Sequence, residues 1–271
     1  MADSVILRDI QYRNHERQTI DILIPKKAVS DSGVILFIHG GGWTQGDKSD
    51  YFADAQHFCR LGYISATMNY RFASKSINFN HVLDDVTNAL KTLKEKCAEY
   101  GYKLNKLILS GGSAGAHIAL LYAYTKKETS PIPPVAACCY CPPADCTKED
   151  FLMGNKGELE SWKYEILSMV CDIEISKNTF LGELSQNALG RISPINYVDE
   201  NCVPTAIFHG KNDELIPIMQ IEDFVKKLSE FNIKHDFVIY ENSNHALDQD
   251  PDSAIKAQDI IKQYAEIHFS C

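Results

Sequence analysis

The chain has 271 residues, of which 45% are hydrophobic and 23% charged, and its formal net charge at pH 7 is −9. These proportions are typical of a globular protein with enough apolar material for a buried core. The acidic balance argues against a nucleic-acid partner, because binding to a phosphate backbone needs clustered Lys and Arg side chains.

The hydrophobic pattern predicts β-strands and α-helices that alternate along most of the chain. The first two strands are close together and are expected to pair antiparallel, whereas the later ones are continuous apolar runs separated by helices. Strands are expected over residues 5–10, 19–24, 34–39, 63–70, 106–110, 135–141, 204–209 and 235–240. Helices are expected over residues 49–61, 80–100, 114–124, 218–231 and 253–268. This alternation predicts an α/β fold with an eight-stranded, mostly parallel sheet covered by helices on both faces.

Residues 142–195 break this alternation. The segment begins with Pro142 and Pro143 and contains a helix-like stretch around residues 162–170. The sequence shows no repeat and no low-complexity linker. We therefore expect one domain over residues 1–271, in which 142–195 is a small cap-like insertion above the sheet.

The chain contains nine cysteines, an odd number. Its N-terminal residues lack the basic start, apolar core and small-residue cleavage site of a secretory signal, so we expect reduced thiols and a cytoplasmic location. No apolar run approaches the ~18 residues of a membrane helix, so we expect no membrane partner. Cys138, Cys139 and Cys141 continue an apolar run and do not form two separated ligand pairs, so we expect them to pack in the core and not to hold a metal.

The segment Gly111–Gly115 fits the pattern G-x-S-x-G, directly after a predicted strand and before a predicted helix. In this context a sharp turn lifts the serine above the end of the sheet. The serine also lies at a helix N-terminus, where free N–H groups favour developing negative charge. The pattern therefore predicts that Ser113 is a nucleophile.

A serine nucleophile needs a base, and the base needs an acid that orients it. His245 follows the last predicted strand, and Asp213 follows the strand before it. The order Ser, Asp, His is the order found in α/β-hydrolases. We expect Ser113, Asp213 and His245 to form a catalytic triad, with Glu214 the weaker candidate for the acid.

Three consecutive glycines follow the strand predicted over residues 34–39. An acyl-transfer reaction passes through an oxyanion that preorganised backbone N–H groups stabilise. We expect these N–H groups to come from Gly41 and Gly42 in this loop and from Ala114, the residue after the nucleophile.

The chain resembles the α/β-hydrolases of the hormone-sensitive-lipase-like carboxylesterase group and their compact relatives, which include small bacterial esterases and kynurenine-formamidase-like enzymes. The resemblance rests on HGGGW at 39–43, NYR at 69–71, GGSAGAH at 111–117, HGKNDELIP at 209–217 and NSNHAL at 242–247. It implies an α/β-hydrolase fold, the same triad and oxyanion hole, and no cofactor. The larger lipase-like members carry an N-terminal helical cap, whereas this chain begins almost at the sheet.

Several other residues lie near the expected site. His39 either contacts substrate or holds the glycine loop by hydrogen bonds, and we expect the second. His117 is expected to be structural, and Asp84 and Asp85 are expected at the start of the long helix, with a buried pairing to Arg71 as one option. The residues that we expect to wall the substrate pocket are Trp43, Tyr70, Trp162 and Met169.

These features predict a serine carboxylesterase that cleaves esters of small uncharged substrates, with acyl chains of roughly two to four carbons, through an acyl-enzyme on Ser113. An arylformamidase and an acetyl-sugar or feruloyl esterase share the same motifs and stay open as alternatives. A further alternative is a non-catalytic small-molecule-binding protein on this fold, which the presence of all three triad residues disfavours. The sequence leaves a homodimer open.

Overall fold

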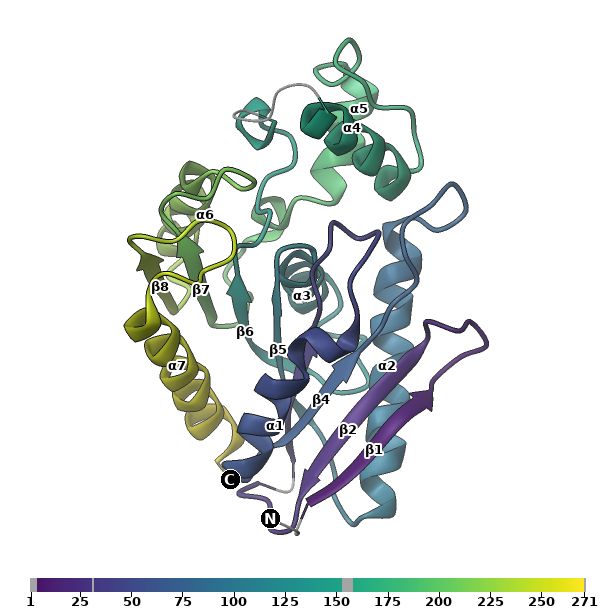
Figure 1. The fold of residues 1–271 in the computed structure, drawn as a ribbon, viewed down its shortest axis with the longest axis vertical. Helices are drawn as coiled ribbons and strands as arrows, with labels where there is room; N and C mark the ends of the chain where they lie inside the picture. Colours follow the sequence, from purple (N-terminus) through teal and green to yellow (C-terminus); the bar gives the residue numbers. More distant parts are fainter. Residues whose placement is uncertain (1–3, 31, 153–157, 271) are drawn as a thin grey trace.

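The computed structural model describes residues 4–30, 32–152 and 158–270. Eight strands form one sheet in the order β1-β2-β4-β3-β5-β6-β7-β8 (Figure 1). They are β1 Ser4–Gln11, β2 Thr19–Pro25, β3 Gly33–Ile38, β4 Ile64–Met68, β5 Lys106–Gly112, β6 Pro134–Tyr140, β7 Thr205–Gly210 and β8 His235–Tyr240. β2 pairs antiparallel with β1 and with β4, and all other neighbours are parallel. The predicted eight-stranded, mostly parallel sheet is confirmed.

Helices cover both faces of the sheet, which explains why its central strands are apolar throughout. On one face α1 (Phe52–Arg60) and α7 (Pro251–Phe269) bury residues such as Phe58 and Ile261. On the other face, α2 (Phe79–Glu99), α3 (Ala114–Thr125) and α6 (Ile218–Glu230) bury residues such as Val86, Leu120 and Phe224. None of the helices in the described part of the chain is both long and apolar enough to cross a bilayer.

Two elements differ from the sequence prediction. The helix expected over 49–61 is divided into a 3₁₀ turn, η1 (Lys48–Tyr51), and α1, and the Asp47 side chain caps η1 through the N–H of Ser49. The helix α5 (Glu183–Arg191) was not expected. It gives little helical periodicity because few of its residues are apolar and one of these, Leu184, is 71% exposed.

The segment 142–195 contains η2 (Glu149–Phe151), α4 (Glu158–Cys171) and α5, and it ends within η3 (Pro194–Tyr197). Figure 1 shows α4 and α5 beyond the carboxyl ends of the parallel strands, at the end of the sheet where β5 leads into α3. In an open α/β sheet, ligands bind at this end. The role of the segment as a cap stays a prediction.

Candidate active site

Ser113 lies on a strained turn between β5 and α3. Its φ and ψ are 53° and −120°, a conformation that residues with side chains rarely adopt. The turn is held on both sides, because the Ser113 N–H donates to Tyr140 O at 2.8 Å and the His117 N–H donates to Ser113 O at 3.0 Å. Strain of this kind at an over-determined position is typical of a functional site.

The small residue at position 115 lets the start of α3 pack against the end of β3. A Cβ atom on Gly115 would lie 2.1 Å from the carbonyl oxygen of Ile38, far inside van der Waals contact. The same carbonyl would be 2.4 Å from a Cβ on Gly111. The two glycines of the G-x-S-x-G pattern therefore allow the close backbone approach that places Ser113 beside the loop after β3.

His245 and Asp213 come together from the loops after β8 and β7. The distance from His245 Nδ1 to Asp213 Oδ2 is 2.7 Å, and the carboxylate is fully buried. Because Nδ1 faces this acceptor, Nε2 is free to act as a base. The His245 ring and Ser113 both line the main cavity. Among the described residues, however, the Ser113 hydroxyl makes no direct hydrogen bond to the ring, a bond that often closes only when substrate is bound.

The backbone that follows Asp213 fixes its carboxylate. Oδ1 accepts hydrogen bonds from the N–H groups of Leu215 and Ile216, both at 2.9 Å. Burial by itself raises the pKa of Asp213, but the hydrogen bond and charge of His245, together with the Ile216 N–H, outweigh burial and hold the pKa below its ordinary value. Asp213 is therefore ionised at neutral pH, as the orienting acid of a triad must be.

Cys141, His209 and Asp213 present three potential metal ligands within 4.8 Å of one another. Both oxygens of Asp213 already accept hydrogen bonds, and His209 Nε2 lies 2.9 Å from Ile216 O. Burial raises the pKa of the Cys141 thiol well above its usual range, which disfavours the thiolate that a metal needs. The contacts fit a packed, hydrogen-bonded group better than a metal site.

The glycine loop after β3 offers backbone N–H groups to the cavity. Gly41 has φ +93°, and its carbonyl accepts hydrogen bonds from Thr44 and Gln45. In the described part of the chain, the N–H groups of Gly41 and Gly42 donate to no protein acceptor, and the N–H of Ala114 belongs to the first turn of α3, where no intrahelical acceptor exists. All three residues line the cavity together with Ser113.

A set of partly buried hydrogen bonds holds this loop in place. His39 Nδ1 lies 2.8 Å from Gly40 O, and the Tyr70 hydroxyl donates to the same oxygen at 3.2 Å. Arg17 approaches His39 Nε2 at 3.2 Å and donates to Gly46 O at 2.9 Å. Because a guanidinium only donates, Nε2 must be the acceptor and Nδ1 must carry the proton given to Gly40 O. In a trans peptide the C=O and N–H point in opposite directions, so bonds to Gly40 O also orient the Gly41 N–H.

His117 connects the glycine loop to the end of the segment 142–195. Its Nδ1 accepts a hydrogen bond from Trp43 Nε1 at 3.2 Å, and its Nε2 lies 2.5 Å from Ile192 O. Burial lowers the pKa of His117 to about 4, so the ring is neutral and Nε2 donates to the carbonyl. The structural role expected for His117 is confirmed by these contacts.

The cavity above Ser113 has a volume of about 560 Å³. Trp43 and Trp162, two of the four expected wall residues, line it. The other two do not. Tyr70 is fully buried below the glycine loop, where its ring stacks on His39 at 4.4 Å. Met169 lies about one helical turn beyond Ile166 on α4 and packs against the core.

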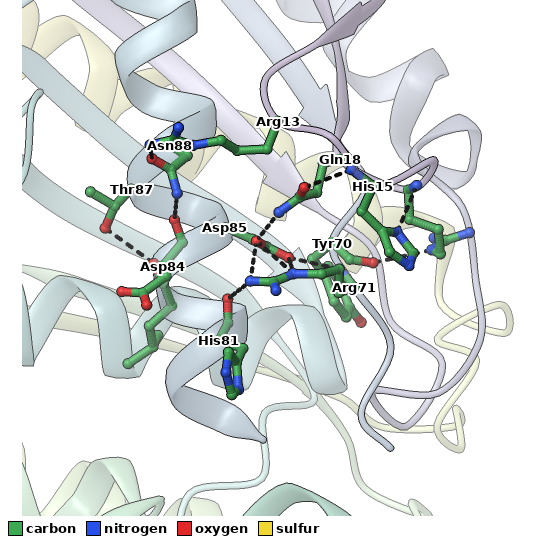
Figure 2. Close-up of polar contacts among 12 residues, drawn as sticks. Arg13, His15, Gln18, Tyr70, Arg71, His81, Asp84, Asp85, Thr87 and Asn88 are labelled. Atoms are coloured by element: carbon green, nitrogen blue, oxygen red, sulfur yellow. Dashed lines mark hydrogen bonds and ion pairs between the residues drawn. The ribbon is translucent and has the colours of Figure 1, made fainter. Parts of the chain in front are cut away.

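Asp85 is part of a separate buried network at the start of α2 (Figure 2). Arg71 Nη2 donates to Asp85 Oδ1 at 2.8 Å, and Gln18 Nε2 donates to the same oxygen at 2.6 Å. Arg71 also donates its backbone N–H to Oδ2 at 2.9 Å. The suggested pairing with Arg71 is confirmed for Asp85, and it ties the chain after Tyr70 to β2 and α2.

Two groups of residues near the site had not been recognised from the sequence. Arg17 lies in the β1–β2 connection, where no motif marks it. Tyr51 and Asp54 line the cavity from η1 and α1, and Gln258 lines it from α7. Both groups are located only by the order of the strands in the sheet. It brings β2, and with it Arg17, beside β4, and it places α1 and α7 on the same face.

The sheet order, the strained serine turn and the loops after β3, β7 and β8 define an α/β-hydrolase fold. The chain belongs to the BD-FAE family, whose sequence model matches residues 20–228. The matched range contains the glycine loop, Ser113 and Asp213, and His245 lies beyond its end. The resemblance to the α/β-hydrolase esterases is thus confirmed.

Individual relatives agree with this assignment. The probable carboxylic ester hydrolase LipM of Mycobacterium tuberculosis is 27% identical over 81% of this chain and 51% of its own length. The chain therefore spans about half the length of this curated relative. Among solved structures, esterase B of Lactobacillus rhamnosis has a TM-score of 0.76 at 17% identity, covering 97% of this chain and 86% of that one. A butyrate-bound esterase, Est2 of Thermogutta terrifontis, has a TM-score of 0.71 at 20% identity, covering 98% and 95%.

Proposed function

We propose that the protein is a serine carboxylesterase that hydrolyses esters of small uncharged molecules. The observation that carries the proposal is the convergence of three features on one cavity. These are Ser113 on its strained turn, the His245 ring bonded to buried Asp213, and the N–H groups of Gly41 and Gly42, which donate to no acceptor among the described residues. The relatives named as ester hydrolases support the same reaction class.

In the proposed reaction, Ser113 Oγ attacks the ester carbonyl while His245 Nε2 takes the hydroxyl proton. The charge that develops on the carbonyl oxygen is stabilised by the N–H groups of Gly41, Gly42 and Ala114. Collapse of the tetrahedral intermediate breaks the ester bond, and His245 returns the proton to the leaving alcohol. Water, activated by His245, then hydrolyses the acyl-enzyme and regenerates the serine. Asp213 keeps the His245 ring in the required orientation and tautomer.

We expect the acyl group to be short, of roughly two to four carbons. The ring of Trp162 lies close to the glycine loop, since a Cβ on Gly42 would be 2.9 Å from it. A long chain would have to displace this ring from the region next to the oxyanion. The butyrate-bound relative is consistent with a short acyl group. A panel of acetyl-sugar, feruloyl and N-formylkynurenine substrates separates the esterase from the related alternatives.

The test is hydrolysis of p-nitrophenyl acetate by the Ser113→Ala variant. We expect kcat to fall by about 10⁴-fold or more, because the variant has no nucleophile. Ser110→Ala is the matched control: Ser110 lies in β5, the strand that leads to Ser113, and its buried hydroxyl has no hydrogen-bond partner among the described residues. Hydrolysis that survives in Ser113→Ala, in protein shown to be folded, would refute the assignment of the nucleophile.

We also propose that the protein works in a reducing compartment such as the cytoplasm. The eight cysteines in the described ranges are free thiols, and six of them are buried. Cys138 and Cys139 lie inside β6, where they pack as small apolar residues. A thiol count after denaturation in the absence of reductant tests the proposal, and a disulfide in protein isolated from its source would contradict it.

A further inference from the structure

The cavity above Ser113 has two chemically different ends. Towards α4 it is walled by apolar side chains such as Trp162, Ile166 and Leu167, which belong to the core on the α2 and α3 side of the sheet. Towards α1 and α7 it is walled by tyrosines, whose hydroxyl groups bring polar atoms to this end. These tyrosines are Tyr51, Tyr140 and Tyr240, which belong to the core on the opposite face. Ser113 lines the same cavity.

The tyrosine end reaches close to the nucleophile. A Cβ on Gly112, the residue before Ser113, would lie only 2.2 Å from the Tyr51 hydroxyl oxygen. No group in the described ranges makes a hydrogen bond with this hydroxyl. Burial raises the pKa of Tyr51, and the charge of Asp54 raises it further, so the hydroxyl stays protonated. A substrate group bound at this end therefore lies next to the neutral hydroxyl of Tyr51.

Asp54, in the first turn of α1, lines the same cavity as this hydroxyl. No described side chain donates a hydrogen bond to its carboxylate. Burial is the largest cause of the raised pKa of Tyr51 and of Tyr140, and the charge of Asp54 adds to it in both. All three residues line the cavity. Among the described residues that line the cavity, the one Lys or Arg is Lys163 on α4, whose Nζ donates to the carbonyls of Phe151 and Leu215.

The tyrosine end is also the end at which the alcohol half of an ester belongs. The proton taken from Ser113 must reach the leaving oxygen from His245, so the alcohol lies on the His245 side of the serine. Leu247, two residues after His245, lines the cavity and packs with the same core face as Tyr51 and Tyr140. The oxyanion loop, by contrast, contacts Trp162 at the apolar end.

We propose that Asp54 is a specificity-determining residue that selects the leaving alcohol by its charge. An alcohol with a cationic group is favoured, a neutral one is accepted and an anionic one is repelled. The physical basis is a carboxylate that lines the cavity and forms no ion pair with any described residue, in surroundings where the effective dielectric constant is below that of water. Burial raises the pKa of Asp54, and its own backbone N–H and the charge of His57, one helical turn further along α1, offset this only in part. The inference rests on the proposed esterase function, because it assigns the end that receives the alcohol, and it replaces an uncharged alcohol by a cationic one as the preferred leaving group.

The experiment compares three acetate esters that differ in the charge of the alcohol: acetylcholine, its uncharged isostere 3,3-dimethylbutyl acetate, and 4-acetoxybutyrate. Hydrolysis is followed by proton release at pH 8, where a carboxylate is ionised. We expect the wild type to have a higher kcat/KM for acetylcholine than for the isostere. In Asp54→Asn this ratio is expected to fall by about three- to tenfold, and the value for 4-acetoxybutyrate is expected to rise by a similar factor.

The control variants separate charge selection from a structural role of Asp54. Asp54→Glu keeps the charge and should keep the preference for acetylcholine. Asp252→Asn removes one charge from the exposed first turn of α7, outside the cavity, and should leave the ratio unchanged. A wild-type ratio of one or less, or an unchanged ratio in folded Asp54→Asn, would overturn the inference alone. Failure of the wild type to hydrolyse the uncharged ester would instead overturn the esterase proposal on which it rests.

Discussion

The Nδ1 atom of His245 lies 2.7 Å from Oδ2 of Asp213, and the other oxygen of this carboxylate accepts two backbone hydrogen bonds. Asp213 therefore has no freedom to turn away, and the histidine can present only Nε2 to the cavity. The geometry gives the pair one function, which is to keep the ring in the tautomer that can take a proton from Ser113.

Asp213→Asn is accordingly expected to lower kcat by about 10⁴-fold with little change in fold. The amide N–H of asparagine would donate to His245 Nδ1, which would move the ring proton to Nε2 and remove the base. The control is Glu214→Gln, which neutralises the exposed neighbouring carboxylate. Steady-state kinetics with p-nitrophenyl acetate test the prediction, and equal losses in the two variants would count against Asp213 as the acid.

Gly41→Ala is expected to lower kcat/KM by about 10²-fold or more, because it disturbs an oxyanion donor. The new Cβ would lie 2.2 Å from Gln45 O, so the loop would have to move. Gly101→Ala is the matched control, since Gly101 has a similar φ of +88° but open space around it. That variant should lose about 1 kcal/mol of stability and keep its activity. Activity and thermal unfolding of both variants distinguish loop displacement from backbone strain.

Trp162→Ala is expected to shift the acyl preference towards longer chains. Removing the indole opens the apolar end beside Gly42, and each further methylene that becomes buried there contributes about 0.8 kcal/mol. The ratio of kcat/KM for p-nitrophenyl hexanoate to that for the acetate should therefore rise. Tyr164→Ala, on the same helix but outside the cavity, should leave the ratio unchanged. An equal rise of this ratio in both variants would mean that the acyl preference depends on the stability of α4 and not on the indole of Trp162.

The free energy of unfolding is expected to fall as the pH drops from about 6.5 to 4.5. Burial lowers the pKa of both His39 and His117 to about 4. An unfolded chain, whose histidines titrate near pH 6.5, takes up protons in this window that the folded protein does not. The stability that these rings contribute is thus complete above about pH 6.5 and is lost towards pH 4, by up to about 3 kcal/mol for each ring.

Urea titrations at several pH values measure this dependence. His117→Gln is expected to be less stable at pH 7 but to lose less free energy between pH 6.5 and 4.5, because one of the two buried rings is gone. A wild-type protein that is equally stable at pH 7 and pH 4.5 would contradict the prediction.

The sequence predicted the elements whose residues are buried on both faces. Strands such as β3 and β5 are recognisable from apolar runs, over residues 34–38 and 107–109. The glycines around Ser113 and in the loop after β3 mark turns that other residues cannot form. The order of Ser113, Asp213 and His245 follows from the same strand ends. These parts depend on local pattern, which a single sequence contains.

The residues that the sequence did not reveal depend on contacts between distant elements. Arg17 becomes meaningful only because β2 pairs with β4, which brings the β1–β2 connection beside the glycine loop. Asp54 looks like an ordinary acidic residue in the first turn of a helix, and only the packing of α1 shows that it lines the cavity. Tyr70 was expected in the pocket wall because it lies beside the expected site in the sequence, but the packing buries its ring against His39.

The hydrogen bonds from Arg17 to His39 and to Gly46 O also affect how the protein acquires activity during folding. The site joins a residue from the first hairpin, the serine from the middle of the chain and a histidine close to the last helix. Contacts of such long sequence separation form late, because loop closure must precede them. Regain of ester hydrolysis after dilution from denaturant would therefore report completion of the whole sheet, and it should lag behind the recovery of helical signal.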